Sequence, residues 1–283
     1  MQVANESVVA LLDNLSDKDS FGMILFNNDT STLQELKSWK DLDRQELSTK
    51  IMNVKQGGGT TLTKGFEAGC AMLRGAKQEK GRDRRMFFFT DMLIGKREFD
   101  RGLRNQFQKA AAEGIYSSFV GMGTNFDTDA VECISSVKGC NYFSVNTPKE
   151  FSKLMNEEFD YITTMDVFDA QIKTTSSDVI PEYVYGSPGN EIPKDGVLCT
   201  MSSSSPSLLD NGRTKGGVIL VKVSTKSEDG FSFSVDTSYV TREDEKHQFS
   251  TQIEFPKATD TDYFENACVR KAILLTRYVR FIK

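Results

Sequence analysis

Short apolar runs alternate with amphipathic stretches through the first half of the chain. The runs are four to six residues long, and they are Phe21–Phe26, Met86–Phe89, Ile115–Val120 and Tyr142–Val145. Between them, apolar residues recur at helical spacing, as in Leu62, Phe66, Cys70 and Leu73. Strands that are apolar at every position are typical of a parallel sheet covered by helices on both faces. The pattern therefore predicts an α/β fold with a doubly wound, mostly parallel sheet.

The pattern changes near Asp166. From Phe168 onward apolar and polar residues alternate, and further strands are expected at Val218–Val223, Phe231–Val235 and Phe249–Phe255. Ser202–Ser205 is interpreted as a loop. An apolar stripe from Phe264 to Ile282 predicts a terminal helix. We expect two domains: an α/β domain over residues 1–165, and a smaller antiparallel β module with a C-terminal helix over residues 166–283.

Charge and hydropathy exclude several classes of protein. The net charge is −5, with 35 basic and 40 acidic residues, so nothing favours binding to nucleic acid or to an anionic membrane. The densest basic cluster, Lys80–Arg85, is interpreted as a solvated turn. No signal peptide and no apolar run long enough to span a membrane is evident, which favours an intracellular protein.

Familiar catalytic and cofactor patterns are also missing from the sequence. The five cysteines are widely spread without a C-x-x-C pair, so neither a disulfide framework nor a zinc site is implied. The single histidine, His247, lies among charged residues and is interpreted as part of a solvated hairpin. The segment Gly57–Lys64 does not have the residue order of a phosphate-binding loop.

Two motifs remain that can carry function. The first is Gly57-Gly58-Gly59-Thr60-Thr61-Leu62, a glycine loop that runs into an amphipathic helix, and the second is Met86-Phe87-Phe88-Phe89-Thr90-Asp91, an apolar strand that ends in Thr-Asp. Ligands of parallel sheets gather beyond the carboxyl ends of the strands. Each motif also has a simpler explanation: a flexible connection for the glycines, and a turn or helix-capping residue for the aspartate.

Taken together and in this order, the motifs resemble the von Willebrand factor type A (VWA) domain, which grips a divalent cation with three loops. The resemblance implies that Thr60 supplies a hydroxyl ligand and Asp91 a carboxylate, to Mg²⁺ or to Mn²⁺ or Ca²⁺. It places Gly58, Gly59 and Thr61 where a protein partner would present an acidic side chain. Such domains begin with a strand that ends in Asp-x-Ser-x-Ser, which this sequence does not show. We therefore expect an incomplete metal site, weak or absent metal affinity, and open edges on two neighbouring strands.

Three functional hypotheses follow. The first is a non-enzymatic protein-interaction module of VWA type with an incomplete divalent-metal adhesion site. The second is a structural or scaffold domain that needs no metal. The third is a metal-assisted hydrolase, for which no general base is evident near Thr60 and Asp91.

Overall fold

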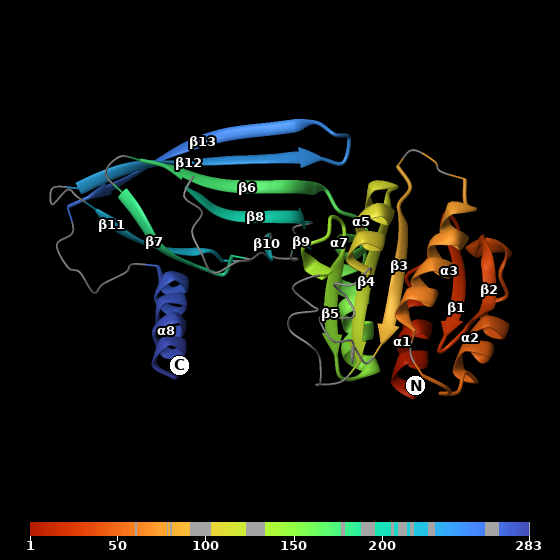
Figure 1. The fold of residues 1–283 in the computed structure, drawn as a ribbon. Helices are drawn as coiled ribbons and strands as arrows, with labels where there is room; N and C mark the ends of the chain where they lie inside the picture. The colour runs from red at the N-terminus through yellow and green to blue at the C-terminus, as the bar shows by residue number, and fades with distance from the viewer. Residues whose placement is uncertain are drawn as a thin grey trace. The chain divides into compact units, whose positions relative to one another are not determined.

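The computed structural model divides into two compact units, Met1–Thr164 (unit 1) and Met165–Lys283 (unit 2) (Figure 1). The structure describes residues 1–59, 61–77, 79, 81–90, 103–122, 134–176, 179–187, 196–204, 207–208, 214–215, 218–225, 230–257 and 266–282.

Unit 1 alternates helices and strands, as the apolar pattern predicts. Its elements are α1 (Gln2–Leu12), β1 (Ser20–Phe26), β2 (Thr30–Ser38), the 3-10 helix η1 (Trp39–Asp41), α2 (Arg44–Met52), α3 (Leu62–Arg74), β3 (Arg84–Thr90), α5 (Arg104–Ala112), β4 (Ile115–Met122), β5 (Asn141–Val145) and α7 (Pro148–Thr163). β3, β4 and β5 form a parallel sheet in that order, whereas β1 pairs antiparallel with β2. β2 has no buried residue, and for that reason it carries no apolar run that would reveal it in the sequence.

Two helices of unit 1, α2 and α7, begin where a side chain satisfies free backbone N–H groups of the first turn. Thr147 caps α7 by accepting a hydrogen bond from Glu150 N at 3.2 Å, and Pro148 follows in the first turn, where its missing N–H leaves no bond unmade. Asp43 caps α2 in the same way, accepting from Gln45 N and Glu46 N. These caps explain why both helices begin at the residues they do.

The helices cover both faces of the β3-β4-β5 sheet. On one face, Met86 and Phe88 of β3 pack into a buried cluster with residues of α3 and α5. On the other face, Phe87 and Phe89 pack against a cluster built from α1, β4, β5 and α7. Successive side chains of a strand point to opposite faces, so an unbroken apolar run fills both layers. The predicted doubly covered sheet is confirmed.

The interpretation of Lys80–Arg85 as a solvated turn is wrong at its carboxyl end. Arg84 and Arg85 begin β3, and the Arg85 guanidinium donates to Thr163 O at 2.9 Å, to Ser118 Oγ at 2.9 Å and to Gly139 O at 3.2 Å. Burial lowers the pKa of Arg85 to about 10. The sequence could not reveal this role, because the oxygens that Arg85 satisfies lie 33 to 78 residues further along the chain.

Unit 2 is an antiparallel β module with a C-terminal helix, as predicted. Its elements are β6 (Val167–Thr175), β7 (Val179–Tyr185), β8 (Val197–Ser204), β9 (Ser207–Leu208), β10 (Thr214–Lys215), β11 (Leu220–Thr225), β12 (Gly230–Thr241), β13 (Lys246–Pro256) and α8 (Ala267–Ile282). One sheet has the strand order β13-β12-β6-β8, and β7 pairs with β11 and β9 with β10. None of the described helices combines the length and the apolar character that a membrane crossing requires.

One expectation for unit 2 is wrong. Ser202, Ser203 and Ser204 were expected in a loop, yet they form the end of β8, where Ser203 pairs with Phe168 and Ser204 with Val167. Pairing with β6 overrides the weak preference of serine for strands, because strand propensity depends strongly on the neighbouring strand.

Candidate functional site

The glycine loop lies against the turn that joins β1 to β2. Thr61 N donates a hydrogen bond to Asn27 O at 2.8 Å, which ties the end of the loop to the end of β1. Gly58 has a φ of +76°, a conformation that favours glycine, and a Cβ added there would lie 3.1 Å from Asn27 Nδ2. A Cβ at Gly59 would lie 2.5 Å from Asn28 Oδ1 and would displace that side chain. The two glycines therefore allow a close approach of loop and turn.

The β1–β2 turn is itself held by short-range bonds and by α3. Asn27 N donates to Asp29 O at 2.8 Å, and Asp29 N donates to Asn27 Oδ1 at 2.9 Å. Lys64, in the first turn of α3, donates to Asn28 O and to Asp29 Oδ1, both at 2.7 Å. The hydrogen bond from Lys64, followed by its charge, lowers the pKa of Asp29. Turn, loop and helix thus form one fixed corner at the carboxyl end of β1.

The structure describes some of the site residues predicted from the sequence and not others. Gly58, Gly59 and Thr61 lie together at this corner, and Thr61 is the N-cap residue of α3, although its side chain makes no capping hydrogen bond. Thr60 and Asp91 lie outside the described residues, so their geometry is not part of the structure. Thr90, the last residue of β3 before Asp91, is buried.

Sequence reasoning missed Asn27, Asn28, Asp29 and Lys64. A signal was present, because Asn-Asn-Asp directly follows the apolar run that ends at Phe26 and therefore stands at the carboxyl end of a predicted strand. The contact with Lys64 had no such signal, since 35 residues separate it from Asp29.

The described part of this corner does not fit a divalent cation. Mg²⁺ and Ca²⁺ bind through several oxygen ligands, among which carboxylates provide most of the affinity. Asp29 is the one carboxylate that the described corner residues contribute, and Lys64 already neutralises it. Within the described ranges, no three His, Cys, Asp or Glu side chains come close enough to hold a metal ion. The positively charged Lys64 ammonium also repels a divalent cation at this corner.

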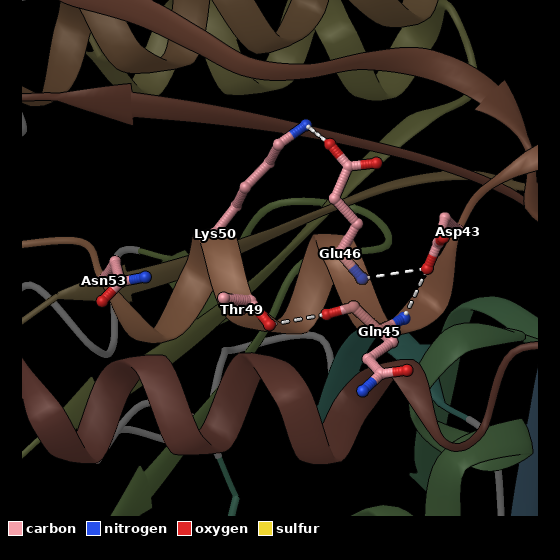
Figure 2. A pocket seen from close by; sticks show the side chains of 6 residues that line it. All are labelled: Asp43, Gln45, Glu46, Thr49, Lys50 and Asn53. Carbon is pink, nitrogen blue, oxygen red and sulfur yellow. Dashed lines mark hydrogen bonds and ion pairs between the residues drawn. The ribbon is translucent and has the colours of Figure 1, made fainter.

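A hollow of about 380 Å³ on α2 is a second place to consider (Figure 2). It is lined by residues of α2 and its two caps, namely Asp43, Gln45, Glu46, Thr49, Lys50 and Asn53. Their polar atoms interact with other residues of the same helix. Lys50 pairs with Glu46 at 2.6 Å, and Thr49 Oγ1 donates a hydrogen bond to Gln45 O at 2.8 Å. Because one helix supplies the whole lining, the hollow has no opposing wall that would hold a ligand.

Comparison with known proteins identifies the family. The model of the von Willebrand factor type A domain matches residues 1–157, which is more than half of the chain. The chain belongs to the VWA domain family. Members of this family generally act as non-enzymatic interaction modules, and some carry a divalent metal at a MIDAS motif. No metal site is shown among the described residues of this VWA protein.

One solved structure supports the same fold, and others are similar over part of the chain. A von Willebrand factor type A protein from Catenulispora acidiphila is similar over 95% of this chain and 65% of its own, with 13% identity and a TM-score of 0.55. The chain thus spans about two thirds of that protein. BatB from Bacteroides thetaiotaomicron is 19% identical over 56% of this chain and 85% of its own, with a TM-score of 0.45.

A mussel byssus protein, proximal thread matrix protein 1, was solved with zinc in its MIDAS motif. It is 18% identical over 55% of this chain and 41% of its own, with a TM-score of 0.45. The comparison with curated proteins gave no match.

Proposed function

We propose that this VWA protein is a non-enzymatic protein-interaction module. Its contact surface is the corner formed by the loop 57–61 and the turn 27–29. The observation that carries the proposal is the fixed geometry of this corner: the exposed glycine loop is tied to Asn27 by Thr61, and the turn 27–29 is tied to α3 by Lys64. A preorganised surface loses little conformational freedom on binding, which favours affinity for a partner.

Within this proposal the partner presents an acidic side chain to Gly58, Gly59 and Thr61. Thr60 and Asp91 are the residues that would contact a divalent ion between the two proteins, and Mg²⁺, Mn²⁺ or Ca²⁺ would supply a positive charge to a carboxylate there. We expect this ion to bind weakly or not at all, since the described neighbours add only the Asp29 carboxylate, which is paired with Lys64.

The state of the buried thiols supports a role without catalysis. Burial raises the pKa of Cys70 to about 11 and that of Cys140 to about 11, so both remain protonated near neutral pH. The thiolate is the nucleophilic form of cysteine, and these two side chains are therefore inert. His247 stacks on Tyr239 in the β12–β13 hairpin and is 3.8 Å from Glu245, which accounts for it without a catalytic role.

Metal affinity is tested by isothermal titration with Mg²⁺ and with Mn²⁺. We expect weak or undetectable heat for the chain and for Asp91→Ala alike. A dissociation constant in the low micromolar range that Asp91→Ala abolishes would contradict the expectation of weak binding and would locate the ion.

Partner binding is tested with labelled short peptides that each carry one Asp or Glu, against the same peptides with Asn or Gln. We expect carboxylate peptides to bind and their amide counterparts to fail. Gly58→Ala should weaken binding about tenfold, because a side chain at positive φ strains the loop by about 1–2 kcal/mol.

Gly57→Ala is the matched control, since a Cβ at Gly57 meets nothing within 4 Å. Equal binding by acid and amide peptides, or equal effects of the two alanine variants, would overturn the proposal.

A metal-independent scaffold is the second candidate, and the Asp29–Lys64 pair favours it. The Lys64 ammonium balances the Asp29 carboxylate and holds the turn in place without any metal ion. Peptide binding that persists in EDTA and falls in Lys64→Met would favour this candidate, whereas binding that disappears in EDTA would favour the metal-dependent form.

A further inference from the structure

β13 (Lys246–Pro256) forms one margin of the four-stranded sheet of unit 2 (Figure 1). Among the described residues it pairs with β12 alone, so its other edge is open. All 11 residues keep one regular register with β12, from Val240 opposite Lys246 to Gly230 opposite Pro256. At 3.4 Å per residue, the open edge is roughly 37 Å long.

Little in β13 protects this edge against pairing with another strand. Proteins protect the edges of sheets with short strands, bulges, prolines and inward-pointing charges. The opposite margin of the sheet, β8, has such protection, because its register with β6 shifts between Ile172 and Lys173 and its first residues, Val197–Cys199, are buried. In β13 the lysine and the proline stand at the two ends, Lys246 and Pro256. The strand between them is long, regular and exposed.

The backbone groups of the open edge can be assigned from the hairpin. Thr241 N donates to Glu245 O at 2.8 Å, which marks these two residues as a hydrogen-bonded pair. Such pairs alternate with non-hydrogen-bonded pairs along an antiparallel ladder. Because the register is regular, odd-numbered residues of β13 direct their N–H and C=O groups to β12, and even-numbered residues direct theirs to the open edge.

One face of the β12–β13 hairpin carries two groups of packed rings. The group at the end of β13 is Phe231, Phe233 and Phe255, and the group near the turn is Tyr239, His247 and Phe249. Both groups reach solvent, since Phe249 is 52% exposed and Phe255 is 44% exposed. Aromatic side chains that are exposed beside an open strand edge are typical of a surface that binds another protein.

The sequence of β13 is complementary to itself when two copies run antiparallel with Thr251 opposite Thr251. Phe249 of one copy then lies opposite Ile253 of the other, and Phe255 lies opposite His247. All of these residues are on the aromatic face, so the ring group near the turn of one copy continues the ring group at the strand end of the other. Aromatic and β-branched pairs of this kind stabilise antiparallel strands.

The charges of β13 suit the same register. Glu254 lies opposite Gln248 and diagonally next to Lys246 of the other copy, and just beyond the strand ends Glu245 lies opposite Lys257. No like charges therefore face each other across the pair. A register shifted by two residues would leave two residues of each strand unpaired, so the centred register makes the most hydrogen bonds.

We propose that two copies of this chain pair edge to edge through β13, antiparallel and with Thr251 on the two-fold axis. Main-chain hydrogen bonds from the even-numbered residues provide affinity, and the aromatic face fixes the register. The pairing joins the two four-stranded sheets into one continuous sheet. A strand from an unrelated protein is a poorer occupant, because it lacks side chains that match those of β13.

This inference goes beyond the proposed function, since it concerns unit 2 rather than the corner at residues 57–61. A contact that is one strand long is small, so the dimer is expected to form in the micromolar range. Sedimentation velocity from about 1 to about 200 μM should show a monomer that becomes a dimer as concentration rises. A monomer throughout this range would overturn the proposal.

Gln252→Pro tests the open edge itself. It removes an N–H that faces outward and leaves the hydrogen bonds to β12 in place, as proline does on edge strands. We expect dimerisation to weaken at least about tenfold, with an unchanged circular dichroism spectrum. Unchanged dimerisation would mean that the edge of β13 is not the interface.

A charge-pairing test shows whether Thr251 opposes its own copy. Thr251 is exposed, and Thr251→Arg or Thr251→Glu alone would place like charges opposite each other. We expect each variant to dimerise at least about fivefold more weakly, and an equal mixture of the two to recover the original affinity. Gln248→Arg is the matched control, because it would lie opposite Glu254 and should not weaken the dimer. Failure of the mixture to recover would overturn the proposal.

Disulfide formation checks the register. Thr251→Cys is made in the Cys268→Ser background, since Cys268 is exposed. Directly opposite residues of antiparallel strands have Cα atoms about 4.5–5.5 Å apart, a distance that a disulfide spans. The two copies of Gln248→Cys would be roughly 20 Å apart. We expect a cross-linked dimer for Thr251→Cys, and none for Gln248→Cys or the parent. Equal cross-linking of the two variants would overturn the pairing about Thr251.

A labelled peptide with the sequence of residues 246–256 separates a second copy from other occupants. We expect it to bind and to compete with the dimer, whereas a scrambled peptide of the same composition should not. If both peptides bind equally to a monomeric chain, the edge accepts unrelated strands and the proposal is wrong. Gly58→Ala should leave dimerisation unchanged, so this proposal and the one for the corner at residues 57–61 can fail independently.

Discussion

β3 of unit 1 and β12 of unit 2 differ both in how far their side chains are buried and in how many neighbouring strands their backbones pair with. Phe88 of β3 is buried against the rings of Phe66 and Phe119, yet within the described ranges the strand pairs along one edge only. β12 pairs with β13 on one side and β6 on the other, although none of its twelve residues is buried.

The difference shows that burial and backbone pairing are separate requirements. Unit 1 holds its two sheets together through the apolar layers on either side, because the hydrophobic effect does not depend on direction. Unit 2 depends more on continuous ladders. Among the described residues, β1 and β3 each pair along one edge, and a cavity of about 810 Å³ lies between them.

The largest expected difference between these strands lies in hydrogen exchange. Alternate amides of β1 and β3 lie on the edges that have no strand partner among the described residues, and they should open with a free energy near zero, whereas the amides of β12 should approach the global stability, about 5 kcal/mol or more. Exchange followed by NMR gives both values in one sample. Uniform protection along β3 would mean that the cavity between β1 and β3 is closed in solution.

The next largest effect is expected from side-chain burial. Phe88→Ala should lower the free energy of unfolding of unit 1 by about 3–5 kcal/mol, because a large buried ring leaves a cavity. Phe233→Ala in β12 should cost roughly 1–2 kcal/mol, since Phe233 is only partly buried and its removal takes away less buried apolar area.

Urea unfolding followed by Trp39 fluorescence reports on unit 1, because Trp39 is the single tryptophan of the chain. Circular dichroism follows unit 2. Equal losses for the two alanine variants would remove the contrast between the strands.

A smaller effect is expected from alkaline pH. Burial raises the pKa of Cys70 and of Cys140 from 9.0 to about 11 in the folded unit. Both thiols lose protons more readily when unfolded, so their contribution is complete below about pH 9 and is lost as pH rises toward 11. The loss is at most about 2–3 kcal/mol per thiol.

Unfolding at several pH values, against the double variant Cys70→Ala/Cys140→Ala, isolates this contribution. A maleimide reagent should also label Cys268, which is exposed on α8, before the two buried thiols. If the free energy of unfolding depends on pH in the same way for both proteins, the two buried thiols do not cause the loss of stability.

The smallest effect is expected from an exposed ion pair. Lys50 and Glu46 lie 2.6 Å apart on α2, with about half or more of each side chain exposed. Lys50→Ala should change the free energy of unfolding by less than about 0.5 kcal/mol, because solvent screens such pairs. A larger loss in thermal unfolding would show that surface charge, rather than burial, contributes substantially to unit 1.

Much of the fold could be predicted from the sequence wherever a strand or helix buries a face. Met86–Phe89 indicated a strand covered on both sides, and the stripe from Leu62 to Leu73 indicated α3, because burial imposes a period on the residues. β2 could not be found in this way, since its side chains are exposed. The end of β8 at Ser202–Ser204 was missed because its partner strand, not its own residues, makes it a strand.

The candidate site was predictable only in part. The glycines of residues 57–59 marked a loop at the carboxyl end of the sheet, since a backbone that approaches another segment closely needs them. The Asn27–Asp29 turn and Lys64 were missed as partners of that loop. The roles of Thr60 and Asp91 in holding a cation remain predictions.

The sequence by itself determined those strands and helices that bury an apolar face, because their burial follows from the local order of apolar and polar residues. It also marked the family through two motifs. Only the tertiary structure decided that Lys64 pairs with Asp29, that Arg85 donates hydrogen bonds to three distant oxygens, and that a cavity lies between β1 and β3. These features depend on atoms brought together from distant parts of the chain, and no local pattern of residues encodes such a distance.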